Sequence, residues 1–136
     1  MMDKDKKITI LKIAFWIGAI TDALAAIVMA FPDLRVYVFG GDKLELAPDY
    51  RYSLGMGAAL MAGWTILLIW GSLKPLDRKG ILVITVFPVI LGIVIAQVYA
   101  VSSGYIETSK MIPVWIHLTV ISSFFLFAYY KAKNIK

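Results

Sequence analysis

Four long apolar runs constrain this chain more than any other feature of its sequence. Each run has about the 20 residues that an α-helix needs to cross a bilayer. Because a backbone in hydrocarbon must satisfy its own hydrogen bonds, runs of this kind fold as helices. The sequence therefore predicts four transmembrane helices, over about residues 8–31, 52–73, 81–103 and 111–130.

Composition leaves little room for any other kind of domain. Hydrophobic residues make up 60% of the 136 residues and charged residues 17%, against about 45–50% and 25% in soluble domains. The connections over about residues 32–51, 74–80 and 104–110 are too short to fold alone. We expect one domain over residues 1–136, an all-α integral membrane protein whose function resides in its helix bundle or at its rims.

The distribution of lysine and arginine predicts an orientation. Ten of them flank the runs on the side of the two termini and four on the other side, which places both termini in the cytoplasm. The expected fold is a four-helix bundle in the cell membrane with up-down-up-down order. We interpret the net charge of +5 as topology and contact with anionic membrane lipid, and expect no nucleic-acid partner.

Prolines mark most of the expected helix ends. Pro32 and Pro75 follow the first and second runs, and Pro113 is expected in the first turn of the fourth helix. Pro88 lies inside the third run, where a missing N–H and a bulky ring kink a helix.

Small residues at a spacing of four predict the faces that pack together, because they allow helix backbones to approach closely in lipid. The expected interior stripes are Ala14, Gly18, Asp22, Ala26 and Ala30 in the first helix, Gly55, Ala59 and Gly63 in the second, and Pro88, Gly92, Ala96 and Ala100 in the third.

Asp22 is the main anomaly, because it lies near the middle of the first run and on its small-residue stripe. A carboxylate at that depth costs roughly 2.5–3.5 kcal/mol on insertion scales. It therefore requires a partner, a proton or a water-filled cavity.

Gln97 and His117 lie at a similar predicted depth, in the outer half of the bilayer. Together with Asp22 they predict a polar layer that either forms a ligand pocket or only links helices by hydrogen bonds. Gly57 is expected to leave free volume in this layer.

Three further residues complete the predicted site. Trp16 and Trp64 lie deeper in their runs and are expected to wall the apolar end of the pocket. Arg51 opens the second run, where we expect it to lie over the pocket and to pair with Asp49 or an anionic headgroup.

Several chemistries lack the residues that they need. The chain has no cysteine and one histidine, so neither a thiolate site nor a histidine-rich metal site is expected. No glycine-rich phosphate loop or nucleophile elbow is present. We expect no cofactor.

These features favour a protein that binds a lipid or small apolar molecule, with Asp22 as acceptor or proton carrier and Gln97 and His117 orienting a polar group. Three alternatives remain: an enzyme acting on a lipid or isoprenoid through Asp22 and His117, an accessory or structural subunit of a membrane complex, and a proton-coupled transporter that works as a homo-oligomer. The sequence favours binding over catalysis.

Overall fold

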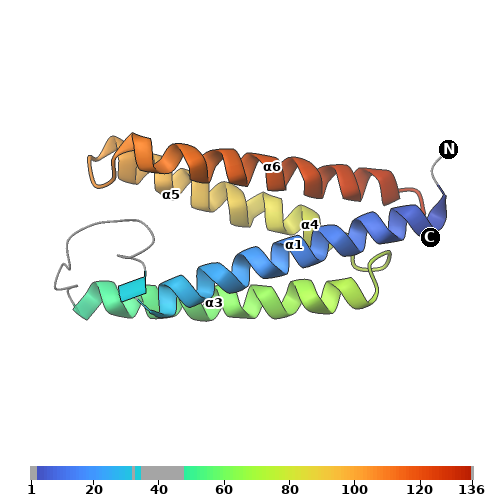
Figure 1. Ribbon diagram of the computed structural model, residues 1–136, viewed down its shortest axis with the longest axis horizontal. Coiled ribbons are helices and arrows are strands. Elements are labelled where there is room, and N and C mark those ends of the chain that lie inside the picture. Colours follow the sequence, from blue (N-terminus) through green and yellow to red (C-terminus); the bar gives the residue numbers. More distant parts are fainter. Residues whose placement is uncertain (1–2, 32, 35–47, 136) are drawn as a thin grey trace. The chain divides into compact units, whose positions relative to one another are not determined.

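The computed structural model describes residues 3–31, 33–34 and 48–135, and this part of the chain contains helices and turns but no strand (Figure 1). The all-α prediction is therefore confirmed for these residues. The helices are α1 (Lys4–Ala30), α3 (Pro48–Leu73), a composite third helix, and α6 (Thr108–Ala132). The third consists of α4 (Gly80–Ile84), the π-helical segment η1 (Thr85–Ile90) and α5 (Leu91–Ser102).

All four helices are long and apolar enough to cross a membrane. Their outward faces are also apolar, because Ile20, Leu60, Ile95 and Ile116, one from each helix, are all more than half exposed. A soluble monomer rarely exposes so much contiguous apolar surface. The helices are therefore compatible with a multi-pass membrane protein.

The chain divides into two compact units. Unit 1 comprises Met1–Phe15 and Gly71–Lys136, and unit 2 comprises Trp16–Trp70. The boundaries fall inside α1 and α3, so each of these helices contributes one part to each unit.

The core of unit 1 lies in the hairpin that α6 forms with the composite helix. Ile121, Phe125, Ala128 and Ala132 are buried in α6. Their alternating spacing of four and three keeps them on one face of the helix.

A tight turn after α5 begins the connection to α6. Gly104 adopts a φ of 73°, and the N–H groups of Gly104 and Tyr105 donate to the carbonyls of Val101 and Ala100. This pair of bonds is a Schellman motif, which requires a left-handed residue and therefore favours glycine.

The predicted kink in the third helix is confirmed. Phe87 leaves helical geometry (φ −122°, ψ 109°) next to Pro88, inside η1, and the peptide bond between them is cis. Proline cannot donate a backbone hydrogen bond there, so the helical ladder is interrupted at this point.

Two other prolines lie close to helix starts, and one of them corrects a prediction. Pro48 is the first residue of α3, where its missing N–H costs nothing. Pro113 is not in the first turn of its helix, because α6 begins earlier, at Thr108. The polar residues before the apolar run continue the helix, so hydropathy alone places its start too late. Pro32 lies outside the described residues.

The small-residue stripes are only partly correct. In α1, Ala14, Gly18 and Ala26 are buried as predicted. In α3 and α5 the prediction is wrong: a Cβ added at Gly55, Gly63 or Gly92 would meet nothing within 4 Å. The buried face of α3 instead carries Ala58, Leu68, Gly71 and Ser72.

Candidate functional site

The contact between α1 and α3 in unit 2 is set at Gly57. A Cβ on Gly57 would lie 3.1 Å from the sulfur of Met29, so the thioether occupies the space that the absent side chain leaves. The free volume predicted at Gly57 is therefore filled by Met29. The two helices run antiparallel at this contact (Figure 1).

Asp22 shares a helix face with Met29, because seven residues make nearly two full turns. The face of α1 that carries Asp22 is thus the face that meets α3. On α3, Trp64 follows Gly57 by the same seven residues. Since the helices are antiparallel, this register brings Trp64 to the level of Asp22. Three of the predicted site residues, Asp22, Gly57 and Trp64, therefore belong to one helix–helix interface.

The carboxylate of Asp22 is the unsatisfied group of this interface. Its Oδ2 is buried and has no hydrogen-bond partner among the described residues. The hydroxyls of Thr21 and Thr65 in the same unit donate 2.9 Å bonds to the carbonyls of Ile17 and Met61, in their own helices. Local side-chain-to-backbone bonds of this kind leave those hydroxyls engaged. Asp22 therefore presents an unoccupied acceptor in an apolar setting.

Trp16 does not line this interface as predicted. Its side chain is 50% exposed. Six residues rotate a helix by about 240°, so Trp16 and Asp22 point to different sides of α1. Trp64 is half-buried. Of the two predicted tryptophans, only Trp64 thus belongs to the interface that contains Asp22.

In unit 1, Gln97 has a partner that the sequence did not predict. The indole Nε1 of Trp115 on α6 donates to its Oε1 at 3.0 Å. His117 is exposed, and it lies about 200° around α6 from Trp115. Because Trp115 faces α5, His117 faces away from it. The structure does not bring Gln97 and His117 together.

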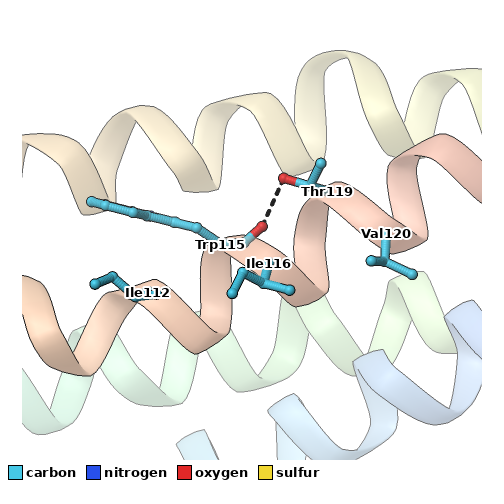
Figure 2. Close-up of a pocket in the computed structure, with 5 residues that line it drawn as sticks. All are labelled: Ile112, Trp115, Ile116, Thr119 and Val120. Atoms are coloured by element: carbon cyan, nitrogen blue, oxygen red, sulfur yellow. Dashed lines mark hydrogen bonds between the residues drawn. The ribbon is translucent and has the colours of Figure 1, made fainter.

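Two hollows lie in unit 1. One, of about 340 Å³, is a depression on α6 lined by Ile112, Trp115, Ile116, Thr119 and Val120; Figure 2 shows the hydroxyl of Thr119 bonded to the carbonyl of Trp115. The other is a groove of about 250 Å³ between the kinked helix and α6. Residues of η1 and α5 supply apolar side chains to it, and α6 adds the hydroxyls of Thr119, Ser122 and Ser123. Neither hollow includes a predicted site residue.

The predicted rim residue Arg51 is exposed in the first turns of α3. It forms no ion pair with Asp49 within the described part of the chain, where the backbone carbonyl of Asp49 instead accepts from the hydroxyl of Ser53. Most of the connection that precedes α3, residues 35–47, lies outside the described residues.

Lys79 is the polar residue that sequence reasoning misjudged, because its basic charge suggested topology and lipid contact alone. Its Nζ donates to the carbonyls of Ala132, Lys133 and Ile135, at 2.9, 3.2 and 2.8 Å. Ala132 is the last residue of α6 and the other two acceptors follow it directly, at a helix end that carries partial negative charge. The only sequence signal for this role is the position of Lys79 just before a helix that pairs with α6.

No group of three or more histidine, aspartate or glutamate side chains in the described residues has a metal-binding arrangement. No protein-family model, no curated protein and no solved structure matches the chain.

Proposed function

We propose that this chain is a multi-pass membrane protein that binds a lipid or small apolar molecule through Asp22. The ligand presents a hydrogen-bond donor or a cationic group to the carboxylate, and its apolar body lies along α1 and α3. The observation that carries this proposal is the buried Oδ2 of Asp22 without a partner in the described residues. An intramembrane ionisable residue of this kind generally marks a functional site.

In the proposed topology the four helices cross the membrane in up-down-up-down order, with both termini in the cytoplasm. The excess of lysine and arginine on the side of the termini supports this orientation. The proposal rests on Asp22 and does not require Gln97, which is engaged by Trp115, or His117, which is exposed.

Native mass spectrometry of the full chain, released from detergent micelles, tests the site. We expect the wild type to carry a discrete adduct that Asp22→Asn loses. Asp49→Asn is the matched control, because it neutralises an exposed carboxylate at the start of α3. It should keep the adduct. Thermal unfolding of Asp22→Asn should occur no earlier than that of the wild type, because the change removes a buried charge.

Two results would contradict the proposal. One is an adduct of equal occupancy on the wild type and Asp22→Asn. The other is the absence of any adduct on the wild type together with a lower unfolding temperature for Asp22→Asn, which would assign Asp22 to helix packing.

A second candidate function is that of an accessory subunit or homo-oligomer. The observation in its favour is that Gly55, Ala59 and Gly63, a small-residue stripe on α3, are exposed. Such stripes allow close helix association within a membrane. Replacing Gly55 and Gly63 together by leucine should then abolish chemical crosslinking between copies, or co-purification with a partner. Unchanged crosslinking and co-purification would remove this candidate.

A further inference from the structure

Three separate segments end at one end of unit 1: the first turns of α1, the turn between α3 and α4, and the end of α6 (Figure 1). Each of them carries basic residues. Two contacts tie these segments together. The ring of Phe15 on α1 lies against Gly71 near the end of α3, and Lys79 bonds the end of α6.

The charge at this end, which we call the basic end, is strongly positive. The described residues there include nine lysines and arginines but only three aspartates. The basic residues are Lys4, Lys6, Lys7, Lys12, Lys74, Arg78, Lys79, Lys131 and Lys133, and the acidic residues are Asp3, Asp5 and Asp77. At the other end of the unit, by contrast, Lys110 is paired with Glu107 at 3.7 Å. The excess positive charge is thus confined to one end.

Not every cation of the basic end is available to a ligand. The three bonds of Lys79 match the three donors of an ammonium group, so Lys79 serves the fold. Lys12 and Lys74 are exposed. Lys131 and Lys133 lie over the rings of Phe127 and Tyr130, 5.4 and 5.9 Å from the ring centroids, and are exposed as well.

We propose that the basic end binds the headgroups of anionic phospholipids, chiefly through Lys12, Lys74, Lys131 and Lys133. Charge complementarity identifies the occupant, because these lysines lie toward the ends of apolar helices that suit acyl chains, and their ammonium groups suit phosphate oxygens at the membrane surface. Phe127 and Tyr130 suit the same boundary between hydrocarbon and headgroups. This inference rests on the membrane-spanning part of the proposed function and does not involve Asp22.

Titration of the full chain with dioleoyl phosphatidylglycerol or dioleoyl phosphatidylcholine, followed by native mass spectrometry, tests the inference. We expect the wild type to bind the anionic lipid at least about a hundredfold more tightly, and the preference to fall as salt rises. Changing Lys12, Lys74 or Lys131 singly to glutamine should weaken phosphatidylglycerol binding about fivefold. The triple variant, in which all three lysines are glutamine, should lose most of the preference for the anionic lipid. The affinity for phosphatidylcholine should not change.

Lys110→Gln is the matched control, because it removes one positive charge from the opposite end of unit 1. It should leave the lipid preference intact. Equal affinities for the two lipids in the wild type, or an undiminished preference in the triple variant, would overturn the inference. Such a result would leave the Asp22 adduct unaffected, so the two proposals fail separately.

Discussion

The Nζ of Lys79 donates to the backbone carbonyl of Ile135 at 2.8 Å, and so connects the turn before α4 to the last described residue of the chain. The same ammonium group bonds the carbonyl of Lys133 at 3.2 Å. Helix C-termini leave their last carbonyls without helical partners. Lys79 therefore closes the end of α6 with charge-assisted bonds supplied by a distant segment.

A second hydrogen bond joins the same two helices toward the other end of the hairpin. The indole of Trp115 on α6 donates to Gln97 on α5. The two contacts lie on opposite sides of the kink at Phe87 and Pro88, so the composite helix is held to α6 both before and after the kink.

Lys79→Met should destabilise the protein by about 1–3 kcal/mol, because three carbonyls lose a charged donor. Lys74→Met is the matched control, since it removes an exposed lysine from the same turn, and it should change stability by less than about 0.5 kcal/mol. Chemical denaturation in detergent micelles measures both. Equal stabilities for the two variants would show that the three hydrogen bonds of Lys79 do not contribute to the stability of the protein.

Gly71→Ala should also be destabilising, by about 1–3 kcal/mol. A Cβ at Gly71 would lie 2.9 Å from Cδ1 and Cζ of Phe15, and the Phe15 side chain is fully buried. Gly63→Ala, on the open face of the same helix, should be neutral or stabilising by up to about 1 kcal/mol, because alanine is the better helix former. Opposite signs in thermal unfolding are the expected result, and a stabilising Gly71→Ala would contradict the close approach of the Phe15 ring.

The bond between Trp115 and Gln97 should be measurable in a double-mutant cycle. Trp115→Phe and Gln97→Leu each remove one partner, and the double variant removes both. Because hydrogen bonds between membrane helices are weak on average, we expect a coupling energy of about 0.6 kcal/mol. His117→Ala combined with Gln97→Leu should show none, since the two side chains do not meet. A coupling energy in that second cycle would mean that His117 and Gln97 do interact, as the predicted polar layer requires.

Gly104→Ala should lower the free energy of unfolding by about 1 kcal/mol, because a φ of 73° is strained for alanine. Gly104→Asn should cost less, since asparagine tolerates the left-handed region. Gly92→Ala provides the control, because it lies inside α5 with open space around it. Gly92→Ala should have the highest unfolding temperature, Gly104→Asn an intermediate one and Gly104→Ala the lowest. An unfolding temperature of Gly104→Ala equal to or above that of Gly104→Asn would argue against the Schellman turn.

The residues of the predicted site do not all share one interface. Asp22, Gly57 and Trp64 share one interface, whose pairing follows from the antiparallel register at Met29. The sequence indicated the depth of each group along its helix, because rise per residue is constant. It did not indicate which way each helix is rotated about its axis, and that rotation separates His117 from Gln97.

Within the described residues, the four helices long enough to span a membrane, their apolar character and the kink at Pro88 were determined by the sequence alone. These are local properties, because hydrogen bonding in hydrocarbon and the chemistry of proline act within a few residues. The tertiary structure decided which faces are buried, why Gly71 and Gly57 are close contacts while Gly55 and Gly63 are not, and what Lys79 binds. Those outcomes depend on how large side chains such as Phe15 and Met29 fill the space between helices, and no single helix carries that information.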